Sequence, residues 1–262
     1  MTASYRQFAS VYDRLMENMP YADWLRFART IWDRGQMPRS VVDLGCGTGN
    51  LSIPLAKSGF DVYAIDLSAD MLTMARSKWD ENPGRAVREG NGSLRWLQQD
   101  MREWELPEPV DTVVSFCDCL NYLIEEADIE AAFRATFRGL KPGGMFLFDV
   151  LPPEQLRRYA EQQPFTLDER DVAYIWTCEW EESTCEIEHA LTIFARDERD
   201  AAGRFMRIEE THVERAYDSR RLVDALNRSG FSHVERYADF STVPLSGEAP
   251  PSAERLFFVA VK

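Results

Sequence analysis

SVVDLGCGTGN, residues 40–50, is the stretch that decides the fold of this 262-residue chain. A short apolar run leads into three closely spaced glycines, and a helical pattern follows from about Leu51 to Ser58. Glycines between a strand and a helix let a ligand approach the backbone closely at the carboxyl edge of a sheet, where open α/β sheets bind their ligands. The sequence therefore predicts a cofactor loop at residues 45–49.

The remainder of residues 40–150 alternates strands and helices. Apolar runs at 61–66, 93–99, 110–117 and 145–150 predict four further strands, with helices at 69–78 and 126–139. Strands separated by helices form a parallel, doubly wound α/β sheet with right-handed crossovers. Near the C-terminus, a helix at 220–229 and two strands at 231–239 and 254–262 continue the pattern.

A different pattern interrupts this domain. Three runs, at 172–182, 184–197 and 203–217, alternate with period two and predict an inserted antiparallel three-stranded β-meander. We therefore expect a helical segment at 1–39 that closes over the site, a cofactor-binding domain at 40–152 and 216–262, and an inserted subdomain at 153–215 that contacts substrate or a partner.

The charge balance narrows the range of partners. Acids outnumber bases by 44 to 30, whereas nucleic-acid-binding proteins usually carry a basic stripe. This composition excludes DNA and anionic membrane surfaces as expected partners and disfavours RNA. Residues 165–215 hold 14 acids and 6 bases. We expect most of these acids to coat a solvated face, and the alternative is a negative wall that attracts a cationic amine.

Other composition signals concern location and metals. The chain has no run of about 18 apolar residues and no secretion-type start, so we expect neither a membrane span nor export. Its five cysteines are odd in number and match no zinc spacing. We therefore expect reduced thiols, a cytoplasmic location and no metal site.

The glycine spacing and its neighbours indicate the cofactor. A nicotinamide cofactor favours G-x-G-x-x-G, whereas this loop is G-x-G-x-G and follows Asp43. That carboxylate would repel the pyrophosphate of a nicotinamide cofactor, whereas it would suit a ligand with a cationic amino-acid end. A nicotinamide dehydrogenase is therefore the disfavoured alternative. Asp66 ends the second strand, where an acid can bind both ribose hydroxyls. Leu67 and Met71 offer apolar surface to an adenine.

Asp100 and Met101 follow the third strand and suit the same adenine. The acid can accept a hydrogen bond from the exocyclic amine, and the thioether can pack on the ring. Ordinary core filling is the alternative for Met71 and Met101.

Taken together, these segments resemble the class I S-adenosylmethionine-dependent methyltransferases. The matching motifs are DLGCGTG (43–49), AIDLS (64–68), QQDM (98–101) and LKPGGMFLFDV (140–150). YRQFASVYDRLM (5–16), SFCDCLNYL (115–123) and the insertion further resemble a bacterial subgroup akin to the YqeM-like proteins.

The resemblance implies a Rossmann-like sheet of order 3-2-1-4-5-7-6 with strand 7 antiparallel. It also places Gly45 and Gly47 against the methionine part of S-adenosyl-L-methionine, Asp66 on the ribose and Asp100 on the adenine. The other residues expected at the cofactor are Tyr12, Asp43, Cys46, Leu67, Met71, Met101, Phe116 and Cys117.

Acceptor-side candidates come from segments that can close over the carboxyl edge. Tyr12 and Tyr5 precede the first strand, and we expect Tyr12 to cover the cofactor and Tyr5 to contact substrate; an apolar stripe packing on the domain is the alternative. Asp118 follows the fourth strand as a catalytic candidate, with Asn121 and Tyr122 as substrate contacts. Capping or a turn is the alternative for Asp118 and Asn121.

Two of the three histidines, His189 and His212, lie in the insertion. Either can act as a general base if it faces the acceptor. His189 shares a face with Ile187 and Leu191, so a satisfied core histidine is its alternative.

These patterns predict a cytoplasmic methyltransferase that transfers a methyl group to nitrogen or oxygen of a small molecule and releases S-adenosyl-L-homocysteine. Close alignment of donor and acceptor can supply much of the catalysis. The alternatives are a protein side chain or an RNA nucleoside as acceptor, and a non-catalytic cofactor-binding module. A homodimer through the insertion is a further expectation.

Overall fold

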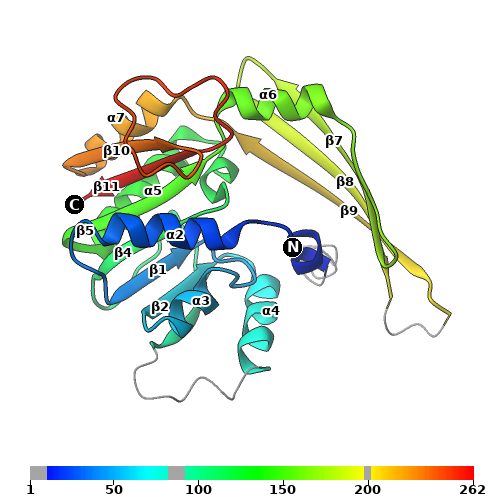
Figure 1. Cartoon of the computed structure of the whole chain (residues 1–262), viewed down its shortest axis with the longest axis horizontal. Coiled ribbons are helices and arrows are strands. Elements are labelled where there is room, and N and C mark those ends of the chain that lie inside the picture. Colours follow the sequence, from blue (N-terminus) through cyan, green and yellow to red (C-terminus); the bar gives the residue numbers. More distant parts are fainter. Residues whose placement is uncertain (1–10, 82–91, 198–201) are drawn as a thin grey trace.

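The computed structural model describes residues 11–81, 92–197 and 202–262. Its central sheet has the order β10-β11-β5-β4-β1-β2-β3 (Figure 1). These strands span Ser40–Leu44 (β1), Asp61–Asp66 (β2), Leu94–Gln98 (β3), Val110–Ser115 (β4), Leu140–Val150 (β5), His233–Ala238 (β10) and Leu256–Val261 (β11). Strands β1 to β5 are parallel, and β11 runs antiparallel to both β5 and β10. The predicted sheet order and the reversed last strand are confirmed.

Helices connect these strands. They span Tyr21–Trp32 (α2), Ser52–Lys57 (α3), Ala69–Asp80 (α4), Glu126–Gly139 (α5), Pro153–Gln162 (α6) and Ser219–Ser229 (α7), with a short 3₁₀ helix at Cys119–Tyr122 (η2). The Ser68 hydroxyl caps α4 by accepting the Met71 N–H at 3.3 Å, and the Asp218 carboxylate caps α7. Gly230, at φ +110°, ends α7 in the left-handed conformation.

Apolar layers cover both faces of the central sheet. On one face, Trp24 and Phe27 of α2 join a buried cluster with Phe257 of β11. On the other, Phe133 of α5 and Leu226 of α7 join a cluster with strands β4, β5 and β11. Because both faces are buried, the strands are nearly continuous apolar runs, which is why the sequence reveals them.

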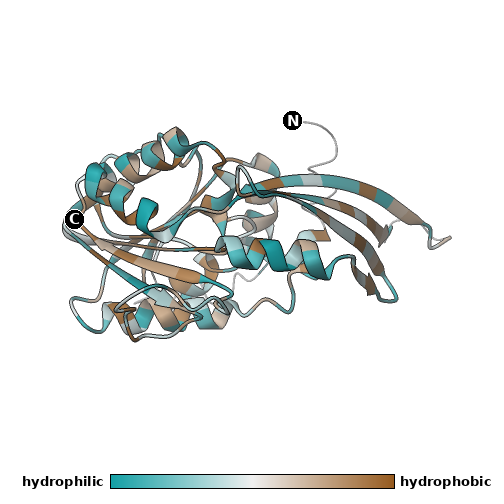
Figure 2. Cartoon of the chain, turned by 90° about the horizontal axis from the view of Figure 1, so that it is seen from above, coloured by the Kyte–Doolittle hydropathy of each residue, from teal (hydrophilic) through white to brown (hydrophobic). Residues whose placement is uncertain are grey.

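A second sheet of order β6-β7-β8-β9 is antiparallel and curves away from the central domain (Figure 2). It comprises Phe165–Asp168 (β6), Val172–Glu181 (β7), Glu186–Arg196 (β8) and Phe205–Arg215 (β9). The predicted three-stranded meander is present, with the four-residue β6 added at its edge. One face packs against Tyr159 of α6 near the central domain and against Val11 and Met71 farther along. We call this face the inner face.

Candidate active site

The cofactor loop lies at the carboxyl ends of β1 and β2. The backbone N–H groups of Gly45 and Cys46 donate to the Ile65 carbonyl at 2.8 and 3.0 Å. Gly45 has φ +81°, and a Cβ there would lie 2.7 Å from Cys119 Sγ, so a side chain at this position is both strained and crowded. Gly47 has φ +54°, and a Cβ there would meet no atom within 4 Å among the described residues. The loop therefore presents its backbone to open space at Gly47.

Two carboxylates hold this loop. Asp66 accepts the Gly47 N–H at 2.7 Å and the Ser68 N–H at 2.8 Å, one on each oxygen. The Leu67 N–H also bonds this carboxylate, which has about four acceptor sites in all and so keeps room for a further donor such as a hydroxyl. Asp43 is buried and accepts the Ser52 hydroxyl at 2.5 Å. Burial raises the Asp43 pKa to about 6 and also raises that of Asp66.

The side chains expected around an adenine fall into two groups. Leu67 is 55% exposed beside Asp66, and the Met101 methyl lies 3.6 Å from the Cβ position of Gly45. These two therefore lie at the surface of the loop. Met71, by contrast, is buried against Val11 and the inner face.

Asp100 and Cys46 have protein partners already. Hydrogen bonds from Arg102, at 2.9 and 3.1 Å through Nε, lower the Asp100 pKa. Cys46 is buried in a small cluster with Ala64 and Leu72.

The N-terminal segment is tied to the loop by a residue that the sequence reasoning missed. Asp13 Oδ1 accepts the Thr48 hydroxyl at 2.6 Å and the Asn50 amide at 3.1 Å, and Asp13 Oδ2 pairs with Lys78 at 2.8 Å. The neighbouring Tyr12 is largely enclosed, which raises its pKa, and it shares a side-chain hydrogen bond with Tyr21. Tyr5 lies outside the described residues.

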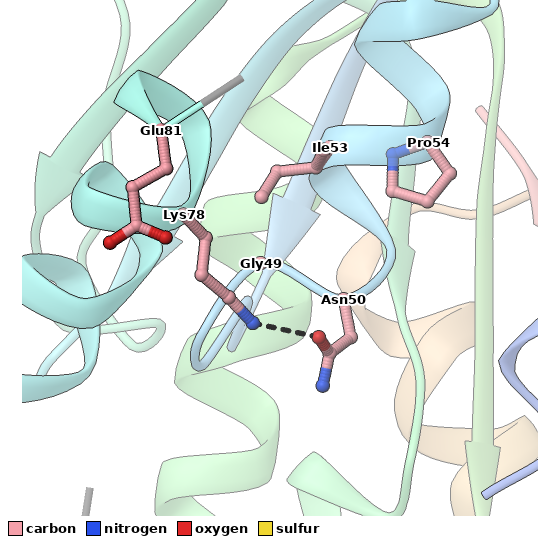
Figure 3. A pocket seen from close by; sticks show the side chains of 6 residues that line it. All are labelled: Gly49, Asn50, Ile53, Pro54, Lys78 and Glu81. Carbon is pink, nitrogen blue, oxygen red and sulfur yellow. Dashed lines mark hydrogen bonds between the residues drawn. The ribbon is translucent and has the colours of Figure 1, made fainter. Parts of the chain in front are cut away.

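A hollow of about 240 Å³ lies beside the same loop (Figure 3). Its lining residues are Gly49, Asn50, Ile53, Pro54, Lys78 and Glu81. Lys78 Nζ crosses it to donate to Asn50 Oδ1 at 2.8 Å. Together with the Lys78–Asp13 pair, this bond joins α4 to the loop. The residues that line the hollow therefore support the loop from behind.

Strand β4 ends in a strained elbow next to the loop. Cys117 and Asp118 have φ values of 63° and 54°, a conformation that costs about 1–3 kcal/mol per residue. Their N–H groups donate to the two oxygens of the buried Asp149 carboxylate, at 2.8 and 3.2 Å. Phe116 is buried beside Phe257, so its side chain packs in the core.

Arg255 completes this support. Its guanidinium donates to Asp118 Oδ1 at 2.7 Å and to Asp149 Oδ2. Trp24 Nε1 donates to Asp149 Oδ1 at 3.0 Å, and the Arg255 guanidinium lies 5.1 Å from the Trp24 ring centre. Asp118, Asp149 and Arg255 therefore form an ionic cluster that supports the elbow, and we call it the ionic cluster.

Helix η2 connects the cofactor loop to the second sheet. Its first residue, Cys119, lies against Gly45. The amide nitrogen of the buried Asn121 donates to the carbonyls of Leu151 and Arg215, and its oxygen accepts the Leu151 N–H. Asn121 thus joins the end of β5 to the end of β9. The last residue, Tyr122, is 47% exposed and lies edge-on to His212, with ring centres 6.0 Å apart.

The inner face supplies polar groups above η2. The register pairs His189 with His212 and Ile187 with Glu214, so all four side chains share this face. His189 Nδ1 accepts Trp176 Nε1 at 3.0 Å, and His189 Nε2 lies 3.7 Å from Glu214 Oε1. Burial lowers the His189 pKa to about 4 and also lowers that of His212, so both imidazoles are neutral near pH 7.

Glu214 is the inner-face residue that the sequence reasoning missed. It is 5% exposed, and its Oε2 has no hydrogen-bond partner among the described residues. Burial raises its pKa well above the usual value, and the nearby Asp118 charge adds to the shift. Most acids of this sheet were expected on a solvated face, and the buried Glu210 and Glu214 are exceptions. The period-two alternation of β9 puts Glu214 on the same face as His212, so this pattern could have identified Glu214 from the sequence.

Comparisons with known proteins agree with this geometry. A family model described as "Methyltransferase domain" matches residues 41–144. Two proteins named "Putative methyltransferase" are each 35% identical to this chain. GWCH70_2453 of Geobacillus sp. (strain WCH70) aligns over 99% of this chain and 100% of its own, and YqeM of Bacillus subtilis (strain 168) over 98% and 97%.

Solved structures extend the likeness to the inserted sheet. An S-adenosylmethionine-dependent methyltransferase from Clostridium acetobutylicum ATCC 824 aligns over 98% of both chains, with a TM-score of 0.81 and 25% identity. The sugar N-methyltransferase KedS8 from Streptoalloteichus sp. ATCC 53650 aligns over 96% of this chain and 92% of its own, with a TM-score of 0.69 and 19% identity. This second likeness concerns the fold alone.

The residues at the loop fit the cofactor of these relatives. Open space at Gly47, a carboxylate with room for a further hydrogen bond at Asp66 and an exposed apolar side chain at Leu67 suit an amino-acid end, a ribose and a purine, respectively. Among the described residues, no helix is long and apolar enough to cross a membrane.

Proposed function

The chain belongs to the S-adenosylmethionine-dependent methyltransferases, and we propose that it methylates nitrogen or oxygen of a small molecule held between η2 and the inner face. S-adenosylmethionine supplies a methyl group already activated on a sulfonium. The protein therefore has to bind, orient and shield the two reactants, and to accept a proton where the acceptor carries one.

The proposed cofactor contacts follow the loop. Gly45 and Gly47 offer backbone to the methionine part, and Asp66 accepts the ribose hydroxyls. Leu67 and Met101 hold the adenine, with Asp100 at its rim. Tyr12 closes the site from the N-terminal segment, with Asp43 and Asp13 stabilising the loop from behind. For Cys46, Met71, Phe116 and Cys117, burial or the elbow geometry supports a role in shaping the site.

One observation supports the acceptor side most strongly. Tyr122 is 47% exposed and lies edge-on to His212, with ring centres 6.0 Å apart. Tyr122 lies three residues after Cys119, which abuts Gly45. We therefore propose an acceptor recess beside this helix, with His189, His212 and Glu214 on the adjacent inner face. Asp118 and Asn121 position η2 in this proposal.

Two of the similar solved structures bear on the size of the acceptor. The KedS8 and CalS10 structures are titled as a sugar N-methyltransferase and an amino pentose methyltransferase, and they align over 96% of this chain. Both titles name small acceptors, and both alignments extend through the inserted sheet, which supports a small acceptor here. The five cysteines are free thiols, which supports a cytoplasmic location. The homodimer through the insertion stays a prediction.

Label transfer from methyl-labelled S-adenosylmethionine into a cell extract tests the proposal. The extract is separated into small-molecule, protein and RNA fractions, and an Asp66→Ala protein serves as the binding-deficient control. We expect label in the small-molecule fraction that depends on Asp66. Label in the protein or RNA fraction would show that the acceptor is a protein or an RNA and not a small molecule. A protein that binds the cofactor but transfers no label would be a non-catalytic module.

A further inference from the structure

The cofactor loop and the elbow begin side by side in the central sheet. They follow β1 and β4, which are neighbouring parallel strands that end at Leu44 and Ser115. The Ser115 hydroxyl donates to the Leu44 carbonyl at 2.8 Å and joins the two strand ends. The loop and the elbow therefore leave the sheet from one common point.

Cys119, the first residue of η2, is where the segment after the elbow touches the loop. Its Sγ lies within hydrogen-bond distance of two carbonyl oxygens, that of Phe116 at 3.0 Å and that of Gly45 at 3.4 Å. The same Sγ lies 2.7 Å from the position that a Cβ at Gly45 would take. Because closely packed interiors transmit small displacements, the position of Cys119 determines the space available to the Gly45 backbone.

The elbow that orients Cys119 needs support from elsewhere in the chain. Cys117 and Asp118 have left-handed φ values, which are unfavourable for residues other than glycine. The Asp149 carboxylate accepts both of their N–H groups, and Arg255 bridges Asp149 to Asp118. Asp149 is buried and the Arg255 side chain is 13% exposed, so little water competes for these bonds. The ionic cluster therefore compensates the strain of the elbow.

We propose that Arg255 is a positioning residue for the cofactor, which fixes the Gly45 backbone through the ionic cluster and Cys119. The inference rests on the proposed contact between Gly45 and the methionine part of S-adenosylmethionine. Arg255 acts through other residues, so it is not a catalytic residue. Since linkage is reciprocal, bound cofactor in turn stabilises the elbow.

Calorimetric binding of S-adenosylhomocysteine tests this role, at a temperature at which circular dichroism shows each variant to be folded. We expect Arg255→Met and Cys119→Ala each to bind about tenfold more weakly than wild type, because the binding-competent loop is then only a fraction of the population. Cys119→Ser retains a donor for the Phe116 carbonyl and should bind within about threefold of wild type. Unchanged affinity in Arg255→Met would overturn the positioning role.

A control variant separates positioning from general stability. Leu226→Ala removes a buried side chain of α7, on the face of the sheet opposite α2. It destabilises the fold by a comparable amount, through a cavity instead of a broken charge pair. Folded Leu226→Ala should bind S-adenosylhomocysteine as wild type does. Equal weakening in Leu226→Ala and Arg255→Met would show that the ionic cluster acts only through stability.

The double variant Arg255→Met/Cys119→Ala tests the route. If the ionic cluster acts through Cys119, the double variant binds about tenfold more weakly than wild type, like each single variant. Independent effects would multiply to about 100-fold and would overturn the route through Cys119. Wild-type protein that fails to bind S-adenosylhomocysteine would overturn the proposed cofactor contacts themselves. Normal binding by both wild type and Arg255→Met would overturn the positioning role alone.

Discussion

The cofactor loop and the acceptor recess differ in how the chain builds them. Gly45, Gly47 and Asp66 come from two adjacent parallel strands, and their contacts form within about one βαβ unit. The proposed recess draws Tyr122 from η2, His189 from β8 and Glu214 from β9, and it lies next to an ionic cluster that includes Arg255 of the loop before β11. In this proposal, a contiguous motif binds the cofactor, whereas distant segments bind the acceptor.

Disruption of the ionic cluster should have the largest effect, because the cluster supports the elbow between the two regions. Arg255→Met leaves Asp149 buried and unpaired, and we expect a loss of about 3–5 kcal/mol in the free energy of unfolding. That loss corresponds to a fall in Tm of roughly 10 °C, measurable by differential scanning calorimetry. A Tm within 2 °C of wild type, about the effect of a neutral surface change, would show that the cluster does not support the elbow.

The Asp66→Ala variant tests the cofactor loop separately from the acceptor side. It removes the acceptor proposed for both ribose hydroxyls, so we expect S-adenosylhomocysteine to bind about 100-fold more weakly by calorimetry. Asp80→Ala, at the exposed end of α4, is the charge-matched control and should bind as wild type. Equal affinities in the two variants would remove Asp66 from the cofactor site.

The pH dependence of stability tests the recess. The folded pKa of His189 is lowered to about 4 by burial, so between pH 4 and about 6.5 the unfolded chain binds more protons than the folded one. Stability from this group is therefore present above about pH 6.5 and is lost as the pH falls towards 4, by about 2–3 kcal/mol. Urea unfolding of wild type and His189→Asn across this range isolates the effect. Parallel curves would mean that His189 is not buried in neutral form.

The smallest expected effect concerns the N-terminal segment. Asp13→Ala removes the acceptor shared by Thr48, Asn50 and Lys78, and we expect S-adenosylhomocysteine affinity to fall about fivefold, as for loss of one hydrogen-bonding group. Asp23→Ala breaks an exposed pair with Arg26 and serves as control. If both variants retain wild-type affinity, the segment does not hold the cofactor loop.

The central sheet was predictable because its signals are local. Most buried strands are apolar runs, and Ser68 and Asp218, residue types typical of helix N-termini, cap two of the helices. The four residues of β6 carry too short a pattern to be recognised. Lys141 to Gly144 contain the proline and glycines typical of a turn, yet they lie within β5, where the register with β4 shifts between Val110 and Thr112.

The acceptor side was harder to predict because its contacts join residues far apart in sequence. Arg255 lies 137 positions from Asp118, and no local pattern connects them. Asp13 lies within a quoted motif, but its bonds to Thr48 and Asn50 appear only in the fold. His189 and His212 were found because histidines are rare in this chain, whereas Glu214 was one acid among many.

A crystal structure with bound S-adenosylhomocysteine tests the central claim most directly. We expect its ribose hydroxyls on Asp66 and its sulfur turned towards Tyr122 and the inner face, so that a methyl group there would point into the recess. A sulfur turned towards the hollow lined by Lys78 and Glu81 would contradict the assignment of the two regions.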